Sequence, residues 1–202
     1  MEVLVVGNTA YVDDDFCAKA FPGDHVQVVA AAEARRDESS PHASWKELLQ
    51  HLDQAYEFDR VVYLSNYLTP HTDTVGDIET LRSVFRACAG RRVQLLYVAG
   101  PAGAEGAADA AGRTGKGIIA RAANDLCRYY AASEGVQTKI LRVPFLYTAS
   151  AALEDPFLVP LFDACSTGSV ALQGAEDAAF PLLCAEELAA VSYTHLTLPT
   201  IA

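Results

Sequence analysis

The chain has 202 residues, enough for one domain with a substantial core and short for two. Hydrophobic residues make up 51% of it and charged residues 20%, which is typical of a globular chain and excludes a disordered one. The formal net charge of −11 argues against nucleic acid as a partner because few basic groups are left to neutralise phosphates, and no apolar run is long enough to span a membrane.

Short β-branched runs alternate along the chain with longer helical patterns. The predicted strands are Val3–Val6, His25–Ala30, Arg60–Leu64, Val93–Val98 and Thr138–Val143. The predicted helices lie at Asp13–Ala20, Ser44–Tyr56, Thr74–Ala89 and Gly115–Glu134. Strands that are apolar on both faces and are joined by helices form parallel sheets covered on both sides. The order therefore predicts an α/β fold, a doubly wound parallel sheet with helices on both faces.

Local signals mark several element ends. Ser44 is a candidate N-cap, with Glu47 three residues on to complete a capping box. Gly90 and Gly135 stand where helices end and a left-handed residue is favoured. The Ala- and Gly-rich segment Gly100–Gly117 has no apolar periodicity, which predicts a long loop at the sheet edge where such folds bind ligands.

Five stretches resemble, in their order along the chain, landmarks of one known family. They are the first strand and its glycine Val3–Gly7, the strand Arg60–Leu64 with Ser65, the strand Val93–Val98, ILRVPFLYT at Ile140–Thr148 and FPLLCAEELAAV at Phe180–Val191. The sequence resembles the extended short-chain dehydrogenase/reductases, the NAD-dependent epimerases/dehydratases. This resemblance implies a Rossmann-like NAD(P)-binding-type domain over residues 1–191, with NAD or NADP as the cofactor if one binds.

The family's cofactor turn is G-x-x-G-x-x-G; here Gly7 matches the first glycine, while Ala10 replaces the second and Asp13 the third. Asp13 opens an acidic triplet at a helix start, where free N–H groups and partial positive charge would otherwise hold a phosphate. A carboxylate about 4 Å from a phosphate oxygen costs on the order of 4 kcal/mol at an effective dielectric of about 20. Two interpretations stay open, a weakened phosphate site and a helix capped by its own carboxylates, and the second is favoured.

The second strand runs out as VVAAA, Val28–Ala32, without the acidic residue that holds a ribose in this family or the basic one that holds a 2′-phosphate. Glu33, Arg35 and Arg36 follow late and are interpreted as a solvated loop. Together with the acidic triplet, this predicts that NAD(H) and NADP(H) bind weakly or not at all. The candidate cofactor-binding residues are Gly7, Asn8, Thr9, Ala10, Ser65 and Lys116.

Catalysis in the family rests on a serine and a Tyr-x-x-x-Lys pair, whose lysine lowers the tyrosine pKa so that the phenol acts as general acid and base. Counting back from Arg142, the tyrosine position falls at Lys116 and the lysine position at Ala120. The serine should follow Val98, where the chain reads Ala-Gly-Pro around Gly100. The resemblance therefore implies degenerate catalytic positions at Lys116, Ala120 and Gly100.

Two further features lie near this stretch. GRTGKG at Gly112–Gly117 resembles a phosphate loop, but Ala110 stands in place of its first glycine and no hydroxyl follows the lysine. Lys116 and the amides of this helix start remain a candidate site for a single anion. Tyr129 and Tyr130 lie on the wrong turns to replace the missing phenol and are expected to pack against the sheet.

Three functions are compatible with these patterns. The favoured one is a degenerate epimerase/dehydratase-like pseudoenzyme that keeps its scaffold for binding a small-molecule nucleotide or a protein partner. The alternative is an active NAD(P)-dependent oxidoreductase or epimerase that acts on a nucleotide-sugar or similar small substrate, with Lys116 as a cationic acid. The third is a structural subunit of a larger assembly.

The cysteines, the histidines and the end of the chain carry further expectations. The cysteines are odd in number, widely spaced and never form C-x-x-C, which predicts reduced, buried thiols in a cytoplasmic protein. The histidines show no metal-ligand spacing, so no metal site is expected. SYTHLTLPTIA at 192–202 breaks the preceding helical pattern, and we expect a non-native tail on a fragment that lacks its C-terminal substrate lobe. Asp155–Gly168 should then form a short apolar helix whose face is partly uncovered.

Overall fold

The fold is taken from a computed structural model of the chain. It describes residues 1–7, 12, 14–30, 58–64, 74–100, 115–143, 145–147, 167–168, 182–185 and 187–191. The predicted helix Ser44–Tyr56, the tail at 192–202 and nearly all of Asp155–Gly168 lie outside these residues.

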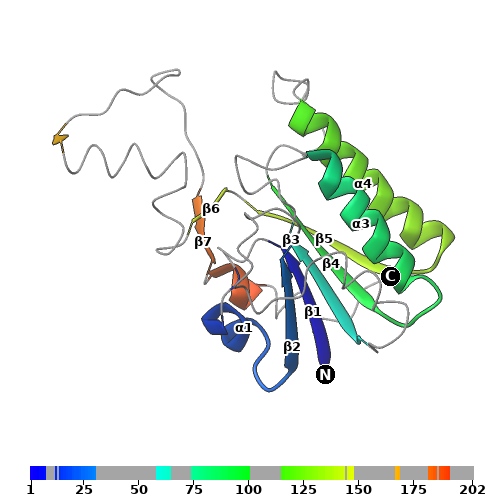
Figure 1. Cartoon of the computed structure of the whole chain (residues 1–202), viewed down its shortest axis with the longest axis horizontal. Helices are drawn as coiled ribbons and strands as arrows, with labels where there is room; N and C mark the ends of the chain where they lie inside the picture. Colours follow the sequence, from blue (N-terminus) through cyan, green and yellow to red (C-terminus); the bar gives the residue numbers. More distant parts are fainter. Residues whose placement is uncertain are drawn as a thin grey trace, which may run out of the picture.

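A parallel five-stranded sheet forms the centre of the fold (Figure 1). Its strands are β1 (Glu2–Gly7), β2 (His25–Ala30), β3 (Arg60–Leu64), β4 (Gln94–Ala99) and β5 (Gln137–Arg142). They are arranged in the order β2-β1-β3-β4-β5, and every neighbouring pair is parallel. The interior of the sheet is apolar: β1, β3 and β4 are buried from their second residue onward, as expected for strands covered on both faces.

Helices α3 (Thr74–Cys88) and α4 (Gly115–Ser133) lie side by side on one face of this sheet (Figure 1). Leu81, Phe85 and Cys88 recur on α3 at helical spacing and are buried against Leu4 and Tyr63 of the sheet. The two helices also contact each other: the rings of Phe85 on α3 and Tyr130 on α4 stack with centroids 4.6 Å apart and planes 5° from parallel.

The opposite face is covered by α1 (Asp14–Ala20) and by a second short helix at 187–191 (Figure 1). Phe16 and Ala20 of α1 share a buried cluster with Leu188 and Ala189 of the later helix. Two short strands that lie along the chain between β5 and this helix, β6 (Phe145–Tyr147) and β7 (Leu182–Cys184), form a separate small parallel sheet. The late part of the described chain therefore returns to the first helix to close this face.

Polar groups tie together the amino-terminal edge of the sheet. The Met1 ammonium group donates to Asp24 Oδ1 at 2.9 Å, and the Glu2 N–H donates to Asp59 Oδ2 at 2.9 Å. His25 Nδ1 lies 2.8 Å from Glu2 Oε2 in an exposed pair. Polar groups at the amino-terminal ends of these strands are therefore bonded to one another.

The predicted fold class is confirmed. In the described range, the ends of each predicted strand and helix lie within two residues of the ends of the observed element. Gly90 and Gly135 have φ angles of 74° and 67°, in the left-handed region expected after a helix. The sequence did not predict β6 or β7. Within the described ranges, no helix is long and apolar enough to cross a membrane.

Candidate functional site

The direction of chain travel across the sheet reverses between β1 and β3. From β1 the chain moves outward to β2, and it then returns past β1 to β3 and continues to β4 and β5. Since all pairs are parallel, the carboxyl ends of these strands share one edge. Open α/β sheets bind ligands at this edge, at the point where the strand order reverses. The candidate site therefore lies beside Gly7 at the end of β1 and Leu64 at the end of β3.

Gly7 has a packing role at this position. A Cβ atom built on Gly7 would lie 2.8 Å from the Cβ of Leu64, closer than real Cβ atoms approach, and 3.2 Å from its Cδ1, which is tighter than most real contacts. Leu64 is buried, so it has little space into which to retreat. The close contact between β1 and β3 requires glycine here whether or not a ligand binds. Gly7 can be identified from its motif, whereas its contact with Leu64 cannot, because the pairing of these strands is not visible in a single sequence.

The remaining candidate residues of the cofactor turn, Asn8, Thr9, Ala10 and Ser65, lie outside the described residues. The acidic triplet is described in part: α1 begins at Asp14, so Asp14 and Asp15 stand in its first turn. With seven residues, α1 is short. The backbone thus places two acidic residues at the helix end where a phosphate would otherwise bind.

The positions that the resemblance assigns to the family's catalytic groups lie at the end of β4 and in the first turns of α4. Ala99 is buried, and its carbonyl accepts a hydrogen bond from the Val143 N–H at 2.9 Å, which joins the ends of β4 and β5. Gly100 follows and is also buried. Lys116 lies in the first turn of α4, and Ala120 is buried one turn later with 6% of its surface exposed. Neither Ala99, Gly100 nor Ala120 has a side-chain group that can transfer a proton.

The two tyrosines of α4 have different environments. Tyr130 is buried in the cluster that includes Tyr63 and Tyr97 of the sheet, as expected, and its ring also stacks on Phe85 of α3. The expectation that Tyr129 packs against the sheet is wrong, because its side chain is 55% exposed. One residue further along a helix rotates the side chain by about 100°, so adjacent positions cannot share one face.

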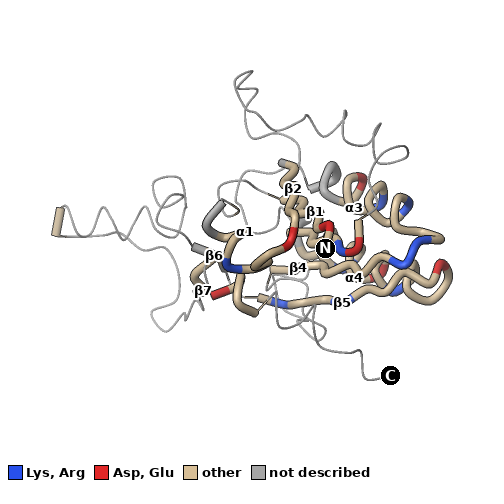
Figure 2. Tube along the Cα trace, turned by 90° about the horizontal axis from the view of Figure 1, so that it is seen from below, with Lys and Arg blue, Asp and Glu red and all other residues tan. Residues whose placement is uncertain are grey.

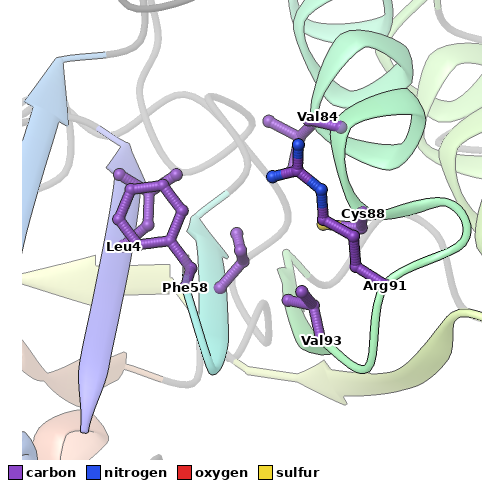
Figure 3. Close-up of a pocket in the computed structure, with 8 residues that line it drawn as sticks. Leu4, Phe58, Val84, Cys88, Arg91 and Val93 are labelled. Atoms are coloured by element: carbon purple, nitrogen blue, oxygen red, sulfur yellow. The ribbon is translucent and has the colours of Figure 1, made fainter. Parts of the chain in front are cut away.

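A hollow lies on the α3 face, near the amino-terminal ends of β1 and β3 (Figure 3). Leu4, Phe58, Val84 and Val93 line it, and the Arg91 side chain extends past Cys88 toward Val84. It is mostly apolar and has room for about one water molecule. Burial raises the pKa of the Cys88 thiol to about 12, against a smaller lowering effect of Arg91, so this thiol is protonated at neutral pH. The hollow is separate from the carboxyl edge and contains no reactive group.

Other expected features concern cysteines and metals. Cys17, Cys88 and Cys127 are buried free thiols, as predicted, whereas the free thiol Cys184 is half-buried; Cys165 lies outside the described residues. In the described part of the chain, no cluster of three His, Cys, Asp or Glu side chains could hold a metal ion.

Comparison with known proteins supports the fold. No protein-family model matches the chain, and no curated protein matches its sequence. Among solved structures, it superposes on the dTDP-glucose 4,6-dehydratase DesIV from Streptomyces venezuelae, solved with NAD bound. The TM-score is 0.70 at 13% identity, over 97% of this chain and 72% of DesIV.

Two further structures extend this similarity. The UDP-glucuronic acid 4-epimerase from Bacillus cereus, solved with NAD, has a TM-score of 0.72 at 12% identity, over 97% of this chain and 73% of the epimerase. The capsular polysaccharide assembling protein CapF from Staphylococcus aureus has a TM-score of 0.62 at 15% identity; all of this chain is covered but 52% of CapF. The chain therefore has the Rossmann-like α/β fold that NAD-dependent epimerases and dehydratases share.

Proposed function

We propose that this chain is an epimerase/dehydratase-like Rossmann protein that acts by binding a nucleotide-type ligand or a protein partner, without the serine and Tyr/Lys hydride chemistry of the family. The observation that carries the proposal is the pair of positions at Gly100 and Ala120. Gly100 follows β4 and Ala120 lies in α4, at the positions that the resemblance assigns to the family's serine and lysine, yet they offer only a backbone and a methyl group. In the family's chemistry the nicotinamide would take the hydride while a phenol, assisted by the serine and the lysine, takes the proton, and Gly100 and Ala120 supply neither of these two assisting groups.

The dinucleotide site is weakened in the same proposal. Gly7 allows β1 and β3 to pack closely, which supports the idea that the chain has kept the Rossmann-like fold. Asp14 and Asp15 in the first turn of α1 oppose a pyrophosphate at that helix start. The negative charge of these two residues would repel an anionic cofactor at a helix start whose free N–H groups would otherwise favour it.

The rival function is an active NAD(P)-dependent oxidoreductase or epimerase that uses a nucleotide-sugar or similar substrate. It is favoured by one feature, Lys116 in the first turn of α4, whose ammonium group would serve as acid in place of the tyrosine. This route requires a bound nicotinamide, so cofactor binding separates the two functions.

Calorimetric titration with NAD+, NADH, NADP+ and NADPH tests the proposal. We expect no saturable binding in the low micromolar range. The double variant Asp13→Gly/Asp14→Ser should bind more tightly, because it removes two carboxylates from the start of α1. The double variant Asp125→Ser/Glu134→Ser is the matched control: it removes two exposed carboxylates from α4 and the turn after it, and should leave affinity unchanged. A low micromolar dissociation constant for the unmodified chain would overturn the proposal.

A further inference from the structure

Helix α4 carries exposed apolar side chains on its outer side. Ile118 and Tyr129 are 53% and 55% exposed. Eleven residues separate them, close to three full turns of an α-helix, so they lie about 20° apart round the axis. Cys127, which is buried in the core, lies about 180° round the helix from Ile118. Ile118 and Tyr129 therefore share the face of α4 that is turned away from the sheet.

Two features suit this face for contact with another helix. Ala122 lies between Ile118 and Tyr129, about 40° round the axis from Ile118, and its small side chain allows a second helix to approach closely. The Tyr129 ring meets the edge of the buried Tyr130 ring, with centroids 5.3 Å apart and planes at 89°. Tyr129 is thereby held in a defined orientation, which lowers the entropy cost of burying it in a contact.

Charged residues of both signs occur along α4 beside these apolar side chains (Figure 2). Asp125 and Arg121 are exposed and lie about 20° and 60° round the axis from Ile118. Arg128 Nη1 lies 3.5 Å from Asp125 Oδ1, and since both side chains are more than half exposed this pair is weak and can rearrange. A partner with charges of one sign would repel either Asp125 or Arg121, so a partner with both signs fits this face best.

The order of these side chains is complementary to itself. When two α4 helices lie antiparallel, with a twofold axis midway along residues 118–129, Ile118 of each copy lies opposite Tyr129 of the other. In the same register, Asp125 of each copy lies within one position of Arg121 of the other, which gives two equivalent ion pairs. Ala122 then lies close to the axis, where the two helices approach each other most closely. A second copy of this chain thus matches apolar groups with apolar groups and opposite charges with each other.

We propose that the outer face of α4, defined by Ile118, Arg121, Ala122, Asp125 and Tyr129, is the contact of a symmetric homodimer, with α4 of one copy antiparallel to α4 of the other. The apolar side chains supply the affinity of this contact, and the ion pairs fix its register. The inference goes beyond the proposed function and does not depend on it, because it uses none of the residues on which the cofactor and catalytic arguments depend.

Sedimentation analysis over a wide range of protein concentrations tests the proposal. We expect a reversible dimer of the unmodified chain. Ile118→Ser/Tyr129→Ser should weaken it by more than about tenfold, because the apolar area of both side chains is lost twice in a twofold contact. Lys19→Asp, at an exposed position of α1, is the control that reverses a charge elsewhere and should leave the dimer unchanged. Circular dichroism confirms that each variant is folded.

Charge reversal gives a sharper test of the symmetry. Arg121→Asp and Asp125→Arg should each weaken the dimer by about tenfold or more, because each brings two pairs of like charges together. When the two variants are mixed in equal amounts, they should associate with each other at close to the original affinity. The reason is that each carboxylate of one variant then meets a guanidinium group of the other, which only an antiparallel twofold contact predicts.

Three results would overturn the inference. The first is an unmodified chain that stays monomeric at every concentration. The second is a dimer that is unaffected by Ile118→Ser/Tyr129→Ser, which would place the contact on another face. The third is a mixture of the folded Arg121→Asp and Asp125→Arg variants that associates no better than either variant alone, which would exclude this register. Each result is independent of the cofactor titration, so the dimer contact and the weakened dinucleotide site fail separately.

Discussion

At the scale of single residues, Gly7 belongs both to a sequence motif and to a packing contact. Its place at the end of β1 is that of the first glycine of a dinucleotide turn, and its contact with Leu64 leaves no room for a Cβ. The packing contact with Leu64 is by itself sufficient to explain why this position is a glycine. A lone glycine after a strand is therefore weak support for a bound cofactor.

Gly7→Ala should destabilise the protein by about 1–3 kcal/mol, because the added methyl group overlaps Leu64 in a region with no spare volume. Urea unfolding measures this. In a double-mutant cycle with Leu64→Ala, the double variant should lose less than the sum of the single losses, since the smaller side chain makes room. Gly23→Ala is the control: its φ of 81° makes alanine strained, but a Cβ there meets nothing within 4 Å, so its effect should add to that of Leu64→Ala.

Two buried thiols give the stability a pH dependence at the alkaline side. Burial raises the pKa values of Cys88 and Cys127 from 9.0 to about 12. The unfolded chain ionises these thiols from about pH 9, while the folded chain keeps them protonated. Their contribution is thus complete below pH 9 and is lost as the pH rises toward 12, by up to about 1.4 kcal/mol per pH unit for each thiol.

Urea unfolding between pH 8 and 11 checks this expectation. Cys88→Ala/Cys127→Ala should flatten the fall in unfolding free energy with pH, even though it lowers stability at pH 8 by leaving cavities. Val84→Ala leaves a cavity in the same cluster without removing a thiol, so it should lower stability and keep the original slope. An unchanged slope in the double cysteine variant would show that other groups cause the alkaline loss.

At the scale of elements, the sheet is apolar in its interior and carries polar side chains at its amino-terminal ends. Arg60 on β3 and Gln94 on β4 are register partners there. Arg60 Nη1 and Gln94 Oε1 are buried, and neither has a hydrogen-bond partner within the described residues. An unpaired buried polar atom costs about 1–3 kcal/mol. These two atoms therefore lower the stability of the strand starts rather than add to it.

Replacing Gln94 by methionine should leave the protein as stable or raise its unfolding free energy by about 1 kcal/mol, because the variant keeps the length of the side chain and removes the unpaired oxygen. Thermal and urea unfolding measure it. Gln137→Met is the matched control on β5, where the register partner of Gln94 is exposed and the effect should stay within about 0.5 kcal/mol. A clear loss of stability in Gln94→Met would mean that Oε1 is paired.

At the scale of the whole molecule, the carboxyl edge of the sheet beside β1 and β3 is the edge at which open α/β folds bind ligands. Fold similarity to NAD-dependent enzymes does not transfer their chemistry, since reaction type depends on the side chains at the edge.

Assays for nicotinamide-dependent oxidation, reduction and epimerisation with nucleotide-sugars should give no turnover. The physical reason is the absence of a proton-transferring side chain at Gly100 and Ala120. If turnover is found and Lys116→Ala abolishes it, the rival function is correct. Activity that survives Lys116→Ala would place the chemistry outside the positions that the resemblance identified.

Much of the architecture could be predicted from the sequence, because β-branched runs such as Arg60–Leu64 and the helical periodicity of α3 are local signals. Strand β6 and strand β7 were missed, since each has three residues and gains its hydrogen bonds from a segment far away in the chain. The candidate site was predicted less well. Its motif residues, such as Gly7, could be aligned with a family pattern, but the residues that each of them contacts could not be predicted from the sequence.

The sequence alone determined the order of strands and helices, the acidic start of α1 and the absence of an ionisable side chain at Gly100 and Ala120, because these follow from residue identity and short-range periodicity. The tertiary structure decided that Gly7 packs on Leu64 and that Tyr129 faces outward while Tyr130 is buried. Such facts depend on which strands pair and on how a helix is rotated against the sheet. Contacts between distant segments fix both, so no local pattern carries them.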